Sequence, residues 1–320
     1  MEEIGCIFCA NKNAQTVIEE NGYKGRKCLQ CGLIYISPRP TFDEIMELYR
    51  HDNAHASAES HISAGVLKRL YAKHSLEIIN SFITNGAILD IGAGAGYFLD
   101  EARKRGFDPY GIELNNILAN YIRNTWGIPC EESPLGSSSF GGKRFDVIHH
   151  CDVISHFFDP ISEFQRVAQA LRENGLLVFQ TGNFAEVEQR YFRYIQRFEY
   201  PDHLFLFSVD NLRHLVEETG FEFLKVYRYS ILPELIINKG LRRLVGAGKC
   251  KNRTMCTGKR KSGASPPMTI SKAKGAVFNL KGLLRTVYWY FNYFVRYKVG
   301  YIVPKEGCPQ TVIMVARKRN

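Results

Sequence analysis

The sequence predicts an α/β protein in which helices cover both faces of a mostly parallel sheet, preceded by a small metal-binding module. From residue 87 onwards, apolar strand-like segments alternate with amphipathic helical segments. A run of alternate glycines joins the first of these strands to the first helix. Two Cys-x-x-Cys pairs near the N-terminus predict the metal module.

The rest of the chain is organised around the stretch Ile88–Leu99. Its apolar start predicts a strand, and the alternate glycines Gly92, Gly94 and Gly96 predict a tight turn before a helix. Glycines allow positive φ and close approach of a ligand, while the helix N-terminus offers N–H groups. A dinucleotide site of the form G-x-G-x-x-G would need glycine where Tyr97 stands, so a different ligand is indicated.

A second apolar segment, Pro109–Glu113, follows about 20 residues later and ends in an acid placed to accept hydrogen bonds from two ribose hydroxyls. Together, Asp90–Gly96 and Tyr110–Glu113 resemble the cofactor site of class I S-adenosylmethionine (SAM)-dependent methyltransferases. The resemblance implies a Rossmann-like seven-stranded methyltransferase sheet with SAM as cofactor. It also implies the cofactor-binding residues Asp90, Gly92, Gly94, Gly96 and Glu113.

Seven strands are expected in this sheet, at 87–91, 109–113, 128–130, 145–149, 175–181, 221–229 and 310–316. Helices are expected at 63–83, 96–105, 115–126, 160–171 and 209–219. The match to the methyltransferase sheet implies that the final strand is inserted antiparallel. The fold would then close only at the C-terminus, and residues 231–309 would be an insertion before the last strand.

The two cysteine pairs, Cys6 with Cys9 and Cys28 with Cys31, stand 18 residues apart. Four thiolates at this spacing suit a tetrahedral Zn²⁺ ion and leave no open position for catalysis. A module of this size has too small a core to fold unaided, so the zinc is predicted to be structural. The other five cysteines are scattered, which is typical of a cytosolic protein rather than a disulfide-bonded one.

Candidate catalytic residues lie beyond the carboxyl ends of the strands, where open α/β sheets bind ligands. The segment Asp152–Pro160 resembles the stretch after the fourth strand of small-molecule methyltransferases, and His156 is either a base or a cap of the next loop. The segment Tyr200–Ser208 resembles zinc-containing sugar C-methyltransferases, in which a Tyr and a His three residues apart act near the acceptor carbon. That resemblance implies catalytic roles for Tyr200 and His203. Other methyltransferases share this pattern, and in them the histidine shapes the pocket. His203 would act as a base only if the resemblance to the sugar C-methyltransferases holds.

The net charge of +10 is concentrated near the C-terminus, where residues 231–320 hold 19 Lys and Arg and two acids. A basic loop is expected at 246–274 and an aromatic helix at 277–301. One narrow stripe of that helix would carry Lys281, Arg285, Asn292 and Arg296. Three interpretations are open: packing on the domain or on a second subunit, contact with anionic lipid, and a basic lid over a diphosphate-bearing substrate.

The expected division of the chain is a zinc-binding module (1–40), a helical linker (41–85), a SAM-binding core (86–230), the insertion (231–309) and the final strand (310–320). The start of the sequence lacks a signal-peptide pattern, and no stretch reaches 18 uncharged apolar residues. These features predict a cytoplasmic protein, with residues 277–301 as the candidate for peripheral contact with an anionic membrane.

The leading functional hypothesis is SAM-dependent methyl transfer to a small molecule, a sugar or sugar-like intermediate of surface polysaccharide or secondary metabolism. The aromatic helix favours an alternative, O-methylation of a lipid or quinone-like acceptor. The basic segment and zinc module favour another, an RNA methyltransferase. However, the N/D-P-P-Y/F motif of enzymes that methylate nucleobase amines is absent, so nucleic acid is not the expected partner. A non-enzymatic alternative is a scaffold protein that only binds SAM.

Overall fold

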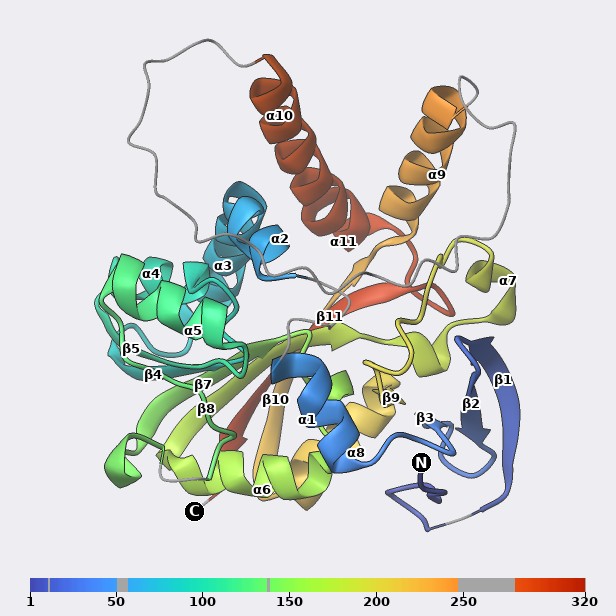
Figure 1. The fold of residues 1–320 in the computed structure, drawn as a ribbon, viewed down its shortest axis with the longest axis horizontal. Coiled ribbons are helices and arrows are strands. Elements are labelled where there is room, and N and C mark those ends of the chain that lie inside the picture. The colour runs from blue at the N-terminus through green and yellow to red at the C-terminus, as the bar shows by residue number, and fades with distance from the viewer. Residues whose placement is uncertain (11, 51–56, 137–138, 247–279, 320) are drawn as a thin grey trace.

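The computed structural model describes residues 1–10, 12–50, 57–136, 139–246 and 280–319 (Figure 1). Its larger sheet has seven strands in the order β10-β11-β8-β7-β4-β5-β6. Their bounds are β4 (Gly86–Ile91), β5 (Phe107–Ile112), β6 (Cys130–Glu131), β7 (Phe145–Cys151), β8 (Leu171–Gly182), β10 (Phe221–Ser230) and β11 (Gln310–Lys318). The pairs from β8 to β6 are parallel, whereas β11 runs antiparallel to both β10 and β8. The predicted seven-stranded sheet with an antiparallel last strand is confirmed.

Helices cover both faces of this sheet (Figure 1). They are α3 (Gly65–Asn80), α4 (Tyr97–Arg103), α5 (Asn116–Tyr121), α6 (Pro160–Ala170) and α8 (Val209–Glu218). On one face, Leu76 of α3 and Phe98 of α4 share a core with Ile88 of β4. On the other face, Phe164 of α6 and Leu212 of α8 belong to a second core. The sheet is therefore the middle layer of three, as the alternation of segments predicts.

Capping residues place the helix starts close to their expected positions. Asp159 caps α6 by accepting the N–H of Ser162, and Pro160 occupies the first turn. Ser208 and Asn211 form a capping box at the start of α8. Both helices begin at the expected residue because these signals act within a single turn of the chain.

The N-terminal module is a second, four-stranded sheet in the order β1-β2-β3-β9. Its strands are β1 (Ala14–Glu20), β2 (Tyr23–Cys28), β3 (Ile34–Ile36) and β9 (Phe205–Leu206). Neither the β1–β2 hairpin nor β9 was predicted from the sequence. Strand β9 comes from the proposed SAM-binding core, yet it pairs antiparallel with β3, and the N–H of Ile36 donates to the carbonyl of Leu204. The two regions therefore share a sheet.

Side-chain contacts reinforce this junction. The Arg39 guanidinium donates to the carbonyl of Phe158 at 2.7 Å and lies 3.7 Å from the centroid of its ring. The amide of Asn211 donates to the carbonyl of Cys31 at 2.9 Å. The cysteine-bearing module is consequently packed on the same elements that border the carboxyl edge of the large sheet.

Further helices flank these sheets: α1 (Phe42–Arg50), α2 (Ala58–Ser63), α7 (Gln189–Phe192), α9 (Leu232–Gly246), α10 (Leu280–Phe294) and α11 (Gly300–Ile302). The helix expected over 63–83 is α3, with the short α2 before it. The aromatic helix expected over 277–301 is α10, continued by a π-helical turn (Val295–Val299) and α11. Helix α9 was not predicted, and nearly all of the expected basic loop at 246–274 lies outside the described residues.

Helices α9 and α10 rise from the same side of the large sheet and diverge from each other (Figure 1). At their base, Arg296 of the π-helical turn forms two hydrogen bonds with Glu234 of α9, at 2.8 and 3.0 Å. Higher up, the hydroxyl of Tyr288 donates to the side-chain carbonyl of Asn238 at 2.9 Å. Within the described residues, none of the helices combines the length and apolarity needed to cross a membrane.

Candidate functional site

The glycine turn after β4 adopts the conformation that its residues predict. Gly92, Gly94 and Gly96 have φ angles of 71°, 55° and 75°, in the left-handed region that residues with a Cβ rarely occupy. A Cβ at Gly92 would lie 2.6 Å from a methyl group of Val153, and one at Gly96 would lie 2.9 Å from Ile122. Both backbone conformation and packing therefore require glycine at these positions.

Glu113, which follows β5, reaches back to the glycine turn. Its Oε2 accepts the N–H of Gly94 at 2.7 Å and its Oε1 accepts the N–H of Asn115 at 2.9 Å. Burial nevertheless raises the pKa of this carboxyl to about 7. Additional hydrogen-bond donors would stabilise the ionised form of this buried carboxyl group, and a ribose diol provides such donors. The chemistry of Glu113 thus fits the predicted ribose-binding role.

Asp90 is buried beside His149 of the neighbouring strand β7. Its Oδ1 lies 2.7 Å from His149 Nδ1, and the imidazole stacks on Phe98 with 3.8 Å between ring centroids. The parallel pairing of β4 with β7 places Asp90 and His149 in register. The glycine motif indicated Asp90 but gave no sign of this partner, because the partner is set by strand pairing.

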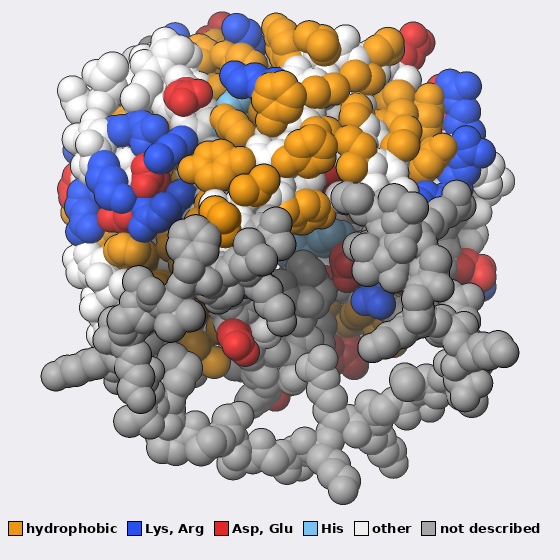
Figure 2. Space-filling model, turned by 90° about the horizontal axis from the view of Figure 1, so that it is seen from above, with side chains coloured by type: hydrophobic (Ala, Val, Ile, Leu, Met, Phe, Trp, Pro, Cys, Tyr) orange, Lys and Arg blue, Asp and Glu red, His pale blue; other side chains and the backbone are white. Residues whose placement is uncertain are grey.

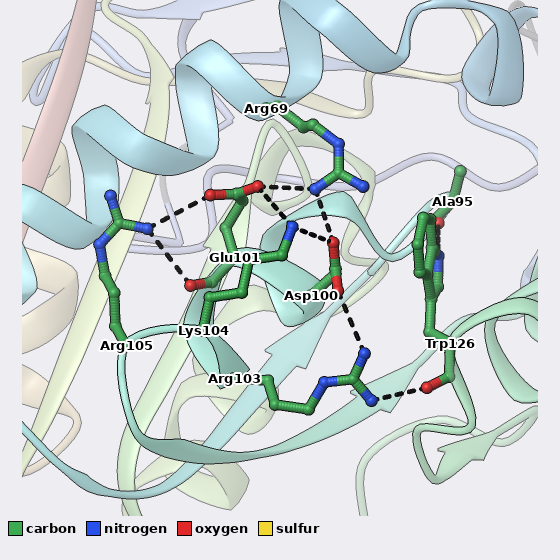
Figure 3. Close-up of polar contacts among 8 residues, drawn as sticks. All are labelled: Arg69, Ala95, Asp100, Glu101, Arg103, Lys104, Arg105 and Trp126. Carbon is green, nitrogen blue, oxygen red and sulfur yellow. Dashed lines mark hydrogen bonds and ion pairs between the residues drawn. The ribbon is translucent and has the colours of Figure 1, made fainter.

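A cluster of ion pairs holds α4, the helix that follows the glycine turn, against α3 (Figure 3). Its acids Asp100 and Glu101 are buried, and Arg69 of α3 donates to both at 2.6 Å. Lys104 contacts the same two carboxylates at 2.7 and 3.1 Å. Burial opposes ionisation of Asp100, but Lys104 and Arg69 outweigh it and keep the pKa of that carboxyl below its usual value.

Trp126 connects this cluster to the glycine turn (Figure 3). Arg103 donates to Asp100 at 3.1 Å and to the carbonyl of Trp126 at 2.7 Å. The indole N–H of Trp126 donates to the carbonyl of Ala95, inside the turn, at 2.9 Å. The turn is therefore held in place by α3 and α4 together, which suits a site that must align a ligand.

A pocket of about 250 Å³ lies at the carboxyl ends of β7 and β8. It is lined by Asp152, Ser155, His156, Thr181, Gly182, Phe184, His203, Phe205, Leu206 and Phe207. The predicted residues His156 and His203 thus line one pocket, and their ring centroids are 4.7 Å apart. The fold brings them together although neither sequence segment indicated contact with the other.

A backbone carbonyl orients each of these histidines. His156 Nδ1 lies 2.9 Å from the carbonyl oxygen of Asp202, and His203 Nδ1 lies 2.8 Å from that of Phe198. Because a carbonyl only accepts, each Nδ1 carries the proton, and Nε2 is the basic nitrogen of each neutral ring. The tautomer that the backbone selects is the one required for a base at Nε2.

Tyr200 does not line this pocket. Its side chain is buried under the N-terminal sheet, where the hydroxyl lies against the backbone of Gly25 in β2. Burial raises the pKa of this phenol, and the nearby charge of Glu20 adds to the effect. The structure therefore does not bring the Tyr200 hydroxyl to the pocket of His203: the Tyr200 hydroxyl lies against β2, whereas His203 lines the pocket.

The four predicted metal ligands converge in the N-terminal module: the Sγ atoms of Cys6, Cys9, Cys28 and Cys31 all lie within 4.8 Å of one another. Four sulfurs at about 2.3 Å from a zinc ion are about 3.8 Å apart, so this donor set fits a tetrahedral ion. Burial opposes ionisation of Cys28, but the N–H groups of Cys31 and Gln30 lower the pKa of its thiol to about 7. Burial instead raises the pKa of the Cys6 thiol to about 11 and also raises that of Cys31, so among these three thiols only Cys28 favours the thiolate form that binds metal.

Known proteins share the central part of this chain. Residues 63–226 match the family model described as a methyltransferase domain. The tRNA U34 carboxymethyltransferase of Campylobacter jejuni is 28% identical over 156 residues, which cover 45% of this chain and 52% of that protein. The ubiquinone biosynthesis O-methyltransferase of Histophilus somni is 27% identical over 111 residues, 32% of this chain and 47% of that protein. The chain therefore spans about half the length of these curated relatives.

Solved structures of similar proteins include a putative methyltransferase from Bacillus halodurans, with 13% identity and a TM-score of 0.45 over 78% of this chain and 99% of that one. Another is the Haemonchus contortus phosphoethanolamine N-methyltransferase 2 in complex with SAM, with 16% identity and a TM-score of 0.47 over 90% of this chain and 62% of that one. The family model spans the glycine turn, Glu113 and both pocket histidines, and covers just over half of the chain. The chain therefore belongs to the methyltransferase domain family.

Proposed function

We propose that this protein transfers a methyl group from SAM to a small-molecule acceptor bound in the pocket of His156 and His203. The observation that supports this most is that two histidines, each with its Nδ1 against a backbone carbonyl, line one pocket at the carboxyl edge of the sheet with 4.7 Å between their ring centroids. The cofactor turn lies close by, since Gly92 packs against Val153, which follows the pocket residue Asp152. Asp152, Ser155, Thr181 and the two histidines give this largely apolar pocket the polar groups that a sugar or sugar-like intermediate of surface polysaccharide or secondary metabolism would bind.

When bound, SAM supplies an electrophilic sulfonium methyl group. The three turn glycines would allow the backbone to approach the cofactor, and Glu113 would bind its ribose. The remaining work of this chain is to align the acceptor and remove its proton. We assign the proton to Nε2 of His203, with His156 beside it.

The four N-terminal cysteines are proposed to bind a structural Zn²⁺ ion, because a closed shell of four thiolates leaves no site for an acceptor. We further propose a cytoplasmic location for the protein. The zinc ion would stabilise the N-terminal module and take no part in the methyl transfer itself.

O-methylation of a lipid or quinone-like acceptor is a second candidate function. Phe184, Phe205 and Phe207 give the pocket an aromatic side on which a planar ring would pack, and one relative is named for ubiquinone biosynthesis. The relatives named for tRNA U34 carboxymethylation also keep RNA open as an acceptor, so the expectation against nucleic acid has no support from the comparisons.

The test is a turnover assay with radiolabelled SAM and a panel of nucleotide sugars, lipid-linked sugars, phenolic quinone precursors and tRNA. We expect transfer to the sugar class, and we expect His203→Ala to lower kcat by about 10²- to 10⁴-fold while SAM affinity is unchanged. His214→Ala, at an exposed position on α8, is the matched control and should retain the wild-type rate.

Unchanged turnover in His203→Ala would remove this residue as the base. Transfer only to the phenols or only to tRNA would replace the sugar proposal with the corresponding alternative. SAM binding without turnover of any acceptor class would favour the scaffold interpretation.

A further inference from the structure

Helix α10 shows its apolar residues to solvent and a polar residue to the protein, the reverse of an ordinary surface helix. Asn292 is buried, and Arg296, one turn later, is engaged with Glu234 of α9. By contrast, Val287 and Phe294 are more than half exposed, at 57% and 56%. The polar stripe predicted for this helix therefore faces inward at its C-terminal end, and the outer face is apolar.

Exposed apolar side chains continue beyond α10 into α11. We define the apolar face by six exposed side chains: Val287, Tyr290, Phe291, Phe294, Tyr301 and Ile302. Ile302 alone is 78% exposed. Figure 2 shows this side of the molecule as a broad hydrophobic area, viewed from above the sheet. Exposed apolar surfaces of this kind mark sites of association with a partner or a membrane.

Positive charge accompanies the apolar face, and negative charge is missing from its sequence. Between Glu234 and Glu306 the chain has 16 Lys and Arg and no Asp or Glu. Among the described residues, Lys298 is exposed, and Lys305 Nζ lies 4.7 Å from the ring centroid of Tyr301. Aromatic rings with adjacent cations are typical of the membrane–water interface, where the rings sit at headgroup level.

We propose that the apolar face docks on an anionic lipid bilayer, with its side chains in the headgroup–acyl boundary and its cations on anionic headgroups. A nucleic-acid strand is the weaker partner, because aliphatic side chains such as Val287 and Ile302 offer bases neither stacking nor charge. A second copy of the chain is also weaker, because Lys298 and Lys305 beside the apolar face would meet like charges in a symmetric contact.

The π-helical turn at the base of α10 contacts the strand that leads into the histidine pocket. The hydroxyl of Tyr297 donates to the side-chain carbonyl of Gln180 at 2.9 Å. Gln180 directly precedes Thr181 and Gly182, which line the histidine pocket. A bilayer could therefore deliver an amphiphilic acceptor to that pocket. This consequence depends on the proposed function, whereas docking itself does not.

Vesicle flotation of the full chain tests the proposal, using phosphatidylcholine vesicles with and without phosphatidylglycerol. We expect flotation with the anionic vesicles only, and less of it as salt is raised. The triple variant Val287→Ser, Phe294→Ser, Ile302→Ser should bind at least about tenfold more weakly. Ile117→Ser, an exposed apolar position on α5, is the matched control and should float like the wild type.

A second variant leaves the apolar side chains intact: Lys298→Glu with Lys305→Glu should also weaken binding to anionic vesicles by about tenfold or more. If the triple variant has a lower melting temperature than the wild type, the charge-reversal variant is the one that tests docking. Wild-type flotation of either variant would overturn the proposal. So would a dimer that the triple variant dissociates, or an RNA interaction that it abolishes, in a protein that binds no vesicles. Flotation needs no turnover, so its outcome is independent of the methyl-transfer assay.

Discussion

At the scale of single residues, the ionisation of Glu113 makes both the stability of the fold and cofactor binding at the glycine turn depend on pH. Burial raises the pKa of its carboxyl from 4.5 to about 7. Between these two values the folded chain binds a proton that the unfolded chain has lost, so this group makes the fold less stable as pH rises through the window. A ribose diol donates best to the ionised carboxylate. Cofactor binding and folding therefore respond to the ionisation of Glu113 in opposite directions.

We predict that SAM binds more tightly as pH rises through 7, by up to about tenfold per unit below the pKa of Glu113. Glu113→Gln should bind SAM about 10- to 100-fold more weakly at pH 8 and should lose most of this pH dependence, because a charged hydrogen bond is removed. Calorimetric titration at pH 6, 7 and 8 measures both effects.

Glu163 on α6 provides the control for this experiment, because burial also raises the pKa of its carboxyl and it pairs with Arg166 rather than with the glycine turn. Glu163→Gln should retain the wild-type pH dependence of SAM binding. A wild-type affinity that stays constant from pH 6 to 8 would contradict the role given to Glu113.

At the scale of elements, β9 links the cysteine site to the histidine pocket. Phe205 and Leu206 of β9 line the pocket, and both also pair with β3 of the N-terminal sheet. The N–H of Leu204 donates to Ser155, another pocket residue, at 2.7 Å. The conformation of this pocket wall therefore depends on the sheet that the cysteines hold together.

Removal of the metal should loosen the acceptor pocket and leave the cofactor turn intact. We predict that the wild type contains about one zinc ion per chain and that Cys28→Ser loses it. Hydrogen exchange should then accelerate at the amides of residues 204–207, because β3 no longer provides a stable partner, while the amides of β4 and β5 keep their protection.

Cys308→Ser changes a buried cysteine outside the metal cluster and should keep both the zinc and the slow exchange of β9. The coupling between the two sites would be refuted if zinc-free protein showed unchanged exchange at residues 204–207. Faster exchange throughout the large sheet would instead show that the metal stabilises the whole fold.

At the scale of the whole molecule, two buried histidines make the fold sensitive to acid. Burial lowers the pKa of His150 to about 3 and that of His74 to about 4, from an ordinary value of 6.5. Between 6.5 and about 4 the unfolded chain binds protons that the folded chain excludes, so stability falls as pH falls. The raised pKa of Glu113 offsets part of this loss, because it acts with the opposite sign.

We predict that the free energy of unfolding decreases from pH 6 to pH 5 by up to about 1.4 kcal/mol for each of these histidines. His150→Leu should reduce this slope, since Leu has no proton to bind, whereas His214→Gln at an exposed position should not. Urea unfolding at pH 7, 6 and 5 gives the slopes. Equal slopes in the wild type and His150→Leu would contradict the prediction.

Elements with local signals were predicted close to their observed bounds. The strand expected at 221–229 is Phe221–Ser230, and the helix expected at 209–219 is Val209–Glu218. In both cases alternating apolar residues or a capping box act within a few residues of the chain. Strand β9 was missed because its two residues form a strand only where β3 offers them an edge.

The sequence by itself determined the glycine turn, Glu113 and the cysteine cluster, because each depends on residue types at short, regular spacings. Only the tertiary structure decided which distant side chains share a pocket. Where β9 pairs with β3, His203 lies beside His156, and the Tyr200 side chain is buried under β2. The tertiary structure also decided that the apolar side of α10 faces outward, because long-range contacts such as that of Arg296 with Glu234 orient the helix and no local spacing encodes them.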